Sequence, residues 1–135
     1  AYFLGFDAPT LNQYLLFGVA DILFIISAVM YLSNAALLYW KEQLRRRRDA
    51  ALETLERLFA GRAHWNVPRG GFYVWLTFDE PVRTGRLFQR AIEHGVLLNP
   101  GDIYDFEGDN SLRLSYSYTT PEEFAAAAET LASLV

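Results

Sequence analysis

The stretch "NSLRLSYSYTTPEEF", residues 110–124, combines a strand pattern with the start of a helix. From residue 111 to residue 118, serine or arginine alternates with leucine or tyrosine, and a side-chain period of two is typical of a half-buried strand. The predicted core face consists of Leu112, Leu114, Tyr116 and Tyr118. Arg113 lies on the opposite face among serines, where its guanidinium faces either bulk water or an anionic ligand.

The end of the same stretch predicts a C-terminal helix. Thr120 is suited to the N-cap, Pro121 to the first helical position and Glu123 to the third. In this arrangement, a capping box, the threonine and glutamate side chains each bond a backbone N–H at the helix start. We therefore expect a helix from residue 121 to the end of the chain.

Working outward, the remaining segments predict a small α+β domain. The run "FYVWLTF" is rich in aromatic and β-branched residues and favours a strand. We predict strands at residues 72–78, 96–99 and 111–118, and helices at residues 41–61, 86–95 (capped by Thr84) and 121–135, with Gly61 and Gly95 at helix ends. Such an order favours a small mixed β-sheet covered by helices and preceded by a long apolar helical segment.

Residues 14–40 carry a single formal charge, at Asp21. Thr10 and Gln13 form a second capping box pattern before this run. One helix over these residues would be about 40 Å long, which is enough to cross a bilayer. The alternative is a buried helix of a larger protein, or two helices with a break at Gly18 or at residues 33–34. The sequence leaves both interpretations open.

The composition excludes several classes of site. The chain has 135 residues, 52% hydrophobic residues and a net charge of −4, so it fits one folded domain and gives no general reason to bind nucleic acid. Cysteine is absent, which excludes disulfides, thiolate metal sites and cysteine nucleophiles. His64 and His94 lack metal-ligand spacing, so we expect no metal site. The run Arg45–Arg48 wraps around its predicted helix and favours a solvated face over a nucleic-acid patch.

Four phrases resemble a known family. In order, they are "RRRRDAALETLE", "PRGGFYVWLTF", "AIEHGVLLNPGDIYD" and "NSLRLSYSYTTPEEF". Together they resemble the C-terminal small domain of fold-type I PLP-dependent aminotransferases of class I/II. The closest branch includes 2-aminoadipate and aromatic aminotransferases and the aminotransferase-like half of GntR/MocR-type regulators. The resemblance covers residues 41–135 and implies a small domain there. Residues 14–40 depart from it, because they are more apolar than the amphipathic helices that the family usually has at this place, and we assign residues 1–40 to an apolar linker or interface helix.

The resemblance assigns a role to Arg113, because an arginine in the family's "LRLS" strand binds the substrate α-carboxylate. A planar guanidinium can hold a carboxylate through two parallel charge-assisted hydrogen bonds, which agrees with that role. The candidates for lining the same pocket are Gly71, Phe72, Tyr73 and Tyr104. For at least two of Phe72, Tyr73 and Trp75 we expect packing in the core instead.

The resemblance also implies pyridoxal 5′-phosphate, bound by a longer parent protein. Lys41 is the only lysine and stands outside any serine-rich lysine motif, so we assign no catalytic residue and expect the isolated chain to be inactive. The implied small-molecule partners are an amino acid and a 2-oxo acid. We expect a cytoplasmic protein that self-associates, without nucleic-acid or membrane partners. The alternatives are the effector-sensing domain of a GntR/MocR-type regulator and a membrane-anchored α+β module.

Overall fold

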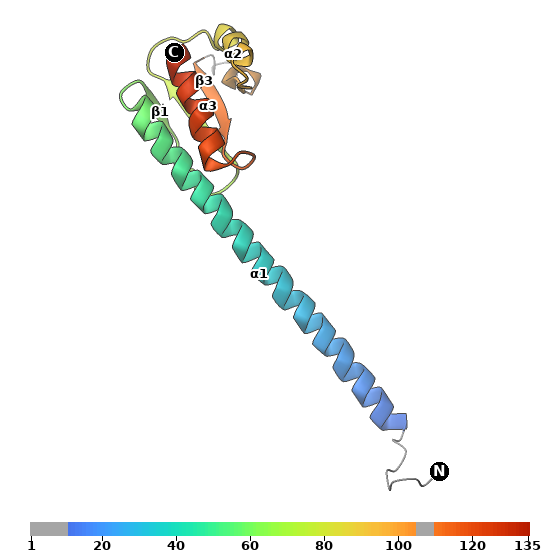
Figure 1. The fold of residues 1–135 in the computed structure, drawn as a ribbon. Coiled ribbons are helices and arrows are strands. Elements are labelled where there is room, and N and C mark those ends of the chain that lie inside the picture. The colour runs from blue at the N-terminus through green and yellow to red at the C-terminus, as the bar shows by residue number, and fades with distance from the viewer. Residues whose placement is uncertain (1–10, 105–109) are drawn as a thin grey trace. The chain divides into compact units, whose positions relative to one another are not determined.

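A computed structural model describes residues 11–104 and 110–135 (Figure 1). The predicted N-cap at Thr10 lies outside these residues. The chain divides into two compact units, Ala1–Lys41 and Glu42–Val135.

Helix α1, Leu11–Phe59, is continuous across the two helices predicted from the sequence. Neither Gly18 nor residues 33–34 interrupt it. The hydroxyl of Ser33 donates to the carbonyl of Met30 at 3.0 Å, so this polar group is satisfied within the helix itself. A serine in an apolar helix therefore does not mark a break here.

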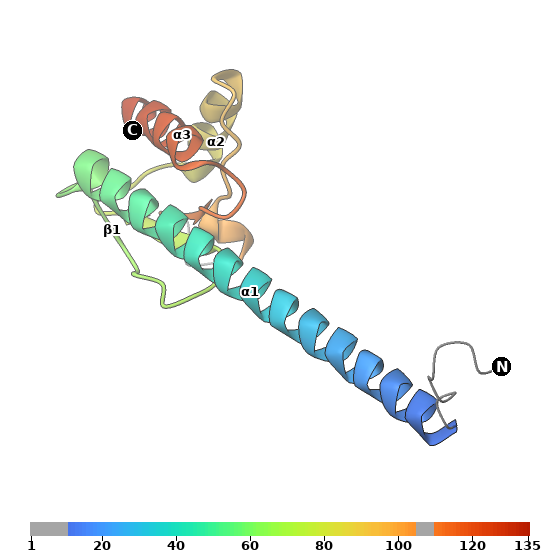
Figure 2. The same ribbon diagram turned by 60° about the horizontal axis from the view of Figure 1, so that its bottom comes forward.

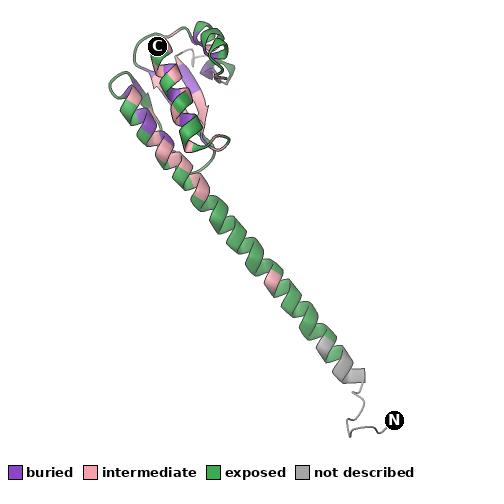
Figure 3. Cartoon of the chain, in the orientation of Figure 1, coloured by how far each residue is buried: buried purple, intermediate pink, exposed green. Residues whose placement is uncertain are grey.

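The described part of the first unit is one apolar helical segment. Its large side chains are exposed, including Phe24 at 73% and Trp40 at 61% (Figure 3). By length and composition, the helical stretch Gly18–Phe59 is the one candidate membrane span in the described residues. The core helix of a soluble protein and a signal sequence meet the same criteria, so this finding alone is weak support for a membrane span.

The second unit contains a three-stranded sheet in the order β1-β2-β3. The strands are β1, Ala63–Trp65, β2, Tyr73–Phe78, and β3, Ser111–Ser115. Both pairs are antiparallel. The α+β class is confirmed, whereas the described strands form an antiparallel sheet and not the mixed sheet that we predicted.

Residues 96–99 do not form the predicted strand. This segment runs into an isolated antiparallel bridge between Pro100 and Leu112. Next to the bridge, the backbone N–H of Arg113 donates to the carbonyl of Asn99 at 2.8 Å. Among the described residues, the backbone pairing of this segment with β3 is therefore limited to the bridge and the adjoining hydrogen bond.

One apolar core joins the helices to one face of the sheet. The helices are the C-terminal part of α1, α2, Thr84–Glu93, and α3, Pro121–Leu134. Both ribbon views place α2 beside α3 (Figures 1 and 2). The most deeply buried core residues include Leu55, Phe59, Val74, Leu76, Ala91, Leu112 and Leu131. Burying one such large side chain contributes roughly 1.5–3 kcal/mol, so this core holds the sheet and the helices together.

The helix ends agree with the sequence except at the start of α2. Glu123 N–H donates to Thr120 Oγ1 at 3.2 Å, and Thr120 N–H donates to Glu123 Oε2 at 2.9 Å, so the capping box is confirmed. Gly61 and Gly95 follow helices with positive φ angles of 72° and 77°. Thr84 is not the N-cap of α2: Arg83 occupies that position, and Thr84 is fully buried.

The basic run of α1 is bonded within the second unit. Arg46 Nε lies 3.0 Å from Glu42 Oε1, and exposed Arg45 lies 4.0 Å from Asp49. Arg47 Nη1 donates to the carbonyl of Ser117 at 2.6 Å, just beyond β3. Arg48 Nη1 similarly reaches the carbonyl of Pro68 at 3.3 Å, ahead of β2. These partners favour a structural role for the arginines over a free anion-binding patch.

Candidate carboxylate-binding site

The register of β2 and β3 places aromatic rings beside Arg113. Trp75 is the partner of Arg113 across the two strands, and Tyr73 is the partner of Ser115. These positions alternate with buried Val74 and with Leu114, so their side chains leave the opposite face of the sheet. The outer face of the sheet therefore carries Arg113 together with two aromatic residues.

This arrangement corrects our prediction for the aromatic run. Phe72 is 49% exposed, Tyr73 is 40% exposed and Trp75 is half-buried, and none of them belongs to the buried core. Val74, Leu76 and Phe78 supply that core instead. Because every residue but one in residues 72–78 is apolar, the period of two does not say which set faces inward.

The guanidinium of Arg113 lies between two tyrosine rings. Its Cζ atom is 4.2 Å from the ring centroid of Tyr73 on β2 and 4.0 Å from that of Tyr104. Tyr104 follows a single 3₁₀ turn, Gly101–Ile103. A cation over an aromatic face is attracted by the ring's negative face. The two rings thus hold the charged group from separate parts of the chain.

Asn99 links Tyr104 back to the strand that carries Arg113. The Tyr104 hydroxyl donates to Asn99 Oδ1 at 3.1 Å, while the Asn99 carbonyl accepts the Arg113 N–H at 2.8 Å. The Tyr104 ring also meets Trp75 edge-on, with centroids 5.9 Å apart. The resemblance placed residues 99–101 and Tyr104 in a loop near the active-site mouth, but it gave Asn99 no role of its own, because a side-chain amide in a turn-rich segment gives no pattern that distinguishes it.

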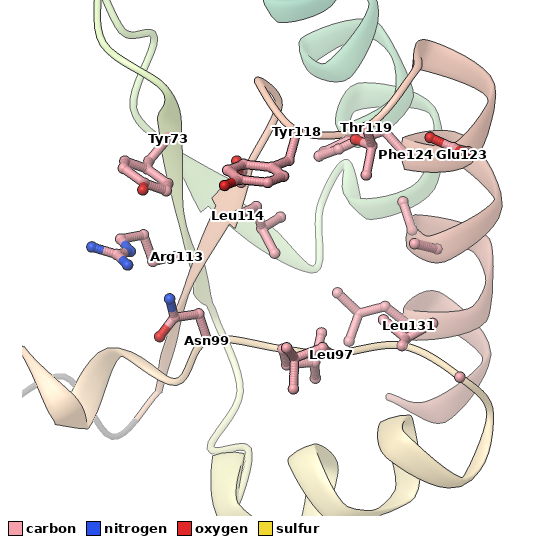
Figure 4. A pocket seen from close by; sticks show the side chains of 16 residues that line it. Tyr73, Leu97, Asn99, Arg113, Leu114, Tyr118, Thr119, Glu123, Phe124 and Leu131 are labelled. Atoms are coloured by element: carbon pink, nitrogen blue, oxygen red, sulfur yellow. The ribbon is translucent and has the colours of Figure 1, made fainter.

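Within residues 11–104 and 110–135, no carboxylate forms an ion pair with Arg113. Its Nε atom is buried and has no hydrogen-bond partner among the described residues. Leaving a buried donor unpaired costs about 1–3 kcal/mol. Figure 4 shows the guanidinium directed away from α3. Such a charged group is suited to an incoming anion.

The two other predicted lining residues lie ahead of β2. Gly71 has a φ of 91°, and its carbonyl accepts a hydrogen bond from the Tyr116 hydroxyl at 2.7 Å. Phe72 packs edge-on against Tyr73, with ring centroids 6.5 Å apart. The structure thus brings Tyr73 and Tyr104 to Arg113, whereas Gly71 serves the turn and Phe72 contacts the site through Tyr73.

A cavity of about 580 Å³ lies between β3, residues 95–99 and α3 (Figure 4). Leu114, Phe124 and Leu131 line its apolar side, on the other side of β3 from the guanidinium. Tyr118 also lines the cavity and is 93% exposed. Its predicted place in the core is wrong, because β3 ends at Ser115 and the chain bends over residues 116–119, where Tyr116 is still buried but Tyr118 is not.

Two observations on the described residues bear on the predictions for a metal ion and for a Schiff-base lysine. No group of three or more His, Asp or Glu residues in the described ranges is arranged to hold a metal ion. Lys41, the only lysine of the sequence, is exposed on α1 and belongs to the first unit, whereas Arg113 belongs to the second. An exposed lysine of this kind lacks the enclosed surroundings that a Schiff-base lysine needs.

The model of the family "Aminotransferase class I and II" matches residues 24–131. The chain belongs to this family. The match begins inside the apolar part of α1, so most of that helix is part of the aminotransferase-related region.

Individual aminotransferases and regulators are similar to this chain. YisV of Bacillus subtilis, described as an uncharacterized HTH-type transcriptional regulator, is 44% identical over 103 residues, which cover 73% of this chain and 21% of YisV. LysN, an alpha-aminoadipate aminotransferase of Thermus thermophilus, is 29% identical with a TM-score of 0.63, covering 69% of this chain and 24% of LysN. The multiple substrate aminotransferase of Thermococcus profundus is 31% identical with a TM-score of 0.65, covering 70% and 24%. The chain spans about a fifth to a quarter of these proteins.

Proposed function

We propose that the chain is the C-terminal substrate-binding part of a PLP-dependent aminotransferase, which transfers an amino group between an amino acid and a 2-oxo acid. Arg113 binds the α-carboxylate that both substrates share. The observation that carries this proposal is the guanidinium held between Tyr73 and Tyr104 with no described acidic partner. Family membership supports the reaction class.

The geometry of a guanidinium explains why this residue suits the task. Its planar fork can donate two parallel hydrogen bonds to a carboxylate, which fixes the orientation of the ligand as well as its position. A substrate held in one orientation presents the same Cα–H bond to the reacting groups each time. We assign the residues that hold PLP to another part of the parent chain, because Lys41 is the only lysine of this sequence and is exposed on α1.

A second candidate function is that of an effector sensor in a transcriptional regulator. The 44% identity to YisV, an HTH-type transcriptional regulator by its description, favours this candidate. In that case the same guanidinium holds the carboxylate of an amino-acid effector, and a separate domain binds DNA. Both candidates share the carboxylate site and differ in what binding achieves.

One experiment separates the candidates. The full-length parent, loaded with PLP, is given L-leucine and 2-oxoglutarate, and glutamate is measured over time. L-Leucine is the amino acid in the ligand of the LysN structure. Steady glutamate formation supports the enzyme. Binding of L-leucine without glutamate, together with DNA binding that depends on L-leucine, supports the regulator instead. Failure to bind any amino acid through its carboxylate contradicts both.

A further inference from the structure

We infer that Tyr104 is a positioning residue, which works with Tyr73 to hold the Arg113 guanidinium in place for the substrate carboxylate. This inference rests on the proposed function of Arg113. It adds the residues that raise the affinity of Arg113 for the substrate carboxylate. The Arg113 Cζ atom lies 4.2 Å from the ring centroid of Tyr73 and 4.0 Å from that of Tyr104. The two tyrosines belong to different parts of the fold. Tyr73 stands on β2, whereas Tyr104 stands outside the sheet.

The surroundings of Tyr104 fix its ring over Arg113. Its hydroxyl donates to Asn99 Oδ1 at 3.1 Å, and its ring meets Trp75 edge-on at 5.9 Å. Asn99 in turn accepts the backbone N–H of Arg113 at 2.8 Å. A closed set of contacts thus runs from the Arg113 backbone through Asn99 and Tyr104 to the Arg113 guanidinium. Arg113 is also the cross-strand partner of Trp75, whose ring contacts the Tyr104 ring, so Trp75 provides a second connection between Arg113 and Tyr104.

Aromatic rings are suited to this task in a way that a carboxylate is not. An aspartate or glutamate partner would occupy the N–H donors that a substrate carboxylate needs. A ring attracts the cation through its face and leaves the in-plane N–H groups free. A long arginine side chain that is already ordered also loses less conformational entropy when the ligand binds. The two rings therefore raise the affinity for the carboxylate without competing with it.

The test compares three variants of the full-length, PLP-loaded parent: Tyr104→Leu, Tyr104→Phe and Arg113→Lys. The Kd is measured for L-leucine and for 3-methylbutylamine, which is leucine without its carboxylate. Losing the ring is expected to weaken L-leucine binding roughly 2- to 30-fold, from the range of cation–π energies. Binding of the amine should not change. The phenylalanine variant keeps the ring but loses the hydrogen bond to Asn99, so its loss of affinity for L-leucine should be smaller than that of the leucine variant.

The outcomes distinguish this inference from the proposed function. If Arg113→Lys weakens L-leucine binding and Tyr104→Leu does not, the positioning role is wrong and the carboxylate site stands. If Arg113→Lys has no effect either, the proposed function itself fails. An equal loss for L-leucine and the amine in Tyr104→Leu also contradicts the inference, because Tyr104 would then shape the pocket without acting through Arg113.

A second measurement needs no change at Tyr104. In an NMR spectrum of this chain, the Arg113 Nε–H signal should lie upfield of the other arginine Nε–H signals, because two ring faces shield it. Arg113→Lys removes one signal and so identifies it. An Arg113 signal at the ordinary arginine position would show that the rings do not hold the guanidinium in solution, and would overturn the inference.

Discussion

Tyr116, just after the strand that carries Arg113, connects this part of the chain to the turn ahead of β2 through one hydrogen bond. Its side chain is 2% exposed, and its hydroxyl donates to the Gly71 carbonyl at 2.7 Å. Burial raises the pKa of Tyr116 above its usual value of 10.0, and the nearby charge of Arg48 opposes part of that rise. The folded chain therefore holds the phenolic proton at a pH where the unfolded chain releases it.

The sign of this shift predicts a loss of stability in alkali. Below about pH 10 the contribution of Tyr116 is fully present, and it declines as the pH rises from there through the raised pKa. Tyr116→Phe should cost about 0.5–1.5 kcal/mol at pH 8 from the lost hydrogen bond. Tyr116→Phe should also make the free energy of unfolding decline less steeply above pH 10, which urea unfolding at several pH values measures. Tyr118→Phe, at a 93% exposed position, is the matched control. It should change neither the free energy of unfolding at pH 8 nor its decline above pH 10. Equal slopes for wild type and Tyr116→Phe would contradict the assignment.

At the residue scale, sequence reasoning selected Arg113 as a candidate but could not predict its surroundings. A lone arginine in a serine face is visible in a period-two pattern. Tyr73 and Tyr104 were named as lining residues, yet their stacking on the guanidinium depends on strand register and on the turn at residues 101–103. Both are set by long-range contacts. The role of Asn99 could not be predicted for the same reason.

At the scale of elements, strong local signals predicted structure best. The capping box located α3, and the aromatic and β-branched run located β2. β1 was missed, because three residues are too few to show a period. Residues 96–99 were wrongly predicted as a strand, because an apolar run between Gly95 and Pro100 says nothing about whether a partner strand pairs along its length.

The capping box of α3 can be tested through stability. Thr120→Ala removes the acceptor for the Glu123 N–H and should destabilise the chain by about 0.5–2 kcal/mol. The melting temperature should fall by roughly 4–8 °C per kcal/mol for a unit of this size. Thr130→Ala is the control in the same helix, because its hydroxyl bonds only the Ala126 carbonyl one turn back. It should change the free energy of unfolding by less than about 0.5 kcal/mol. Equal effects of the two changes would show that the cap contributes nothing.

At the scale of the whole molecule, we expect the apolar helix of the first unit to contact a partner. Residues 18–40 are almost entirely exposed, and a contiguous apolar surface of this kind is rarely left open to water. The sequence predicted this surface correctly but could not say what covers it. Its overlap with the family match favours a protein partner, such as a second copy or the rest of the parent.

Self-association of this chain tests that interpretation. Light scattering without detergent should show a dimer or larger species, and residues 42–135 alone should be smaller and keep the same fold. Circular dichroism of the shorter chain checks that fold. A monomer of the whole chain at high concentration would contradict the prediction. Recovery only in detergent would favour the membrane-anchored alternative.

The most direct test of the carboxylate site is the substrate selectivity of Arg113→Lys in the full-length, PLP-loaded parent. The variant keeps the charge but loses the planar fork. The kcat/KM for L-leucine should fall roughly 10- to 150-fold, which corresponds to about 1.5–3 kcal/mol for one charge-assisted contact. The slow reaction with 3-methylbutylamine and the melting temperature should stay nearly unchanged. Equal losses on both substrates, or a collapse of the melting temperature, would show that Arg113 is structural and does not bind the carboxylate.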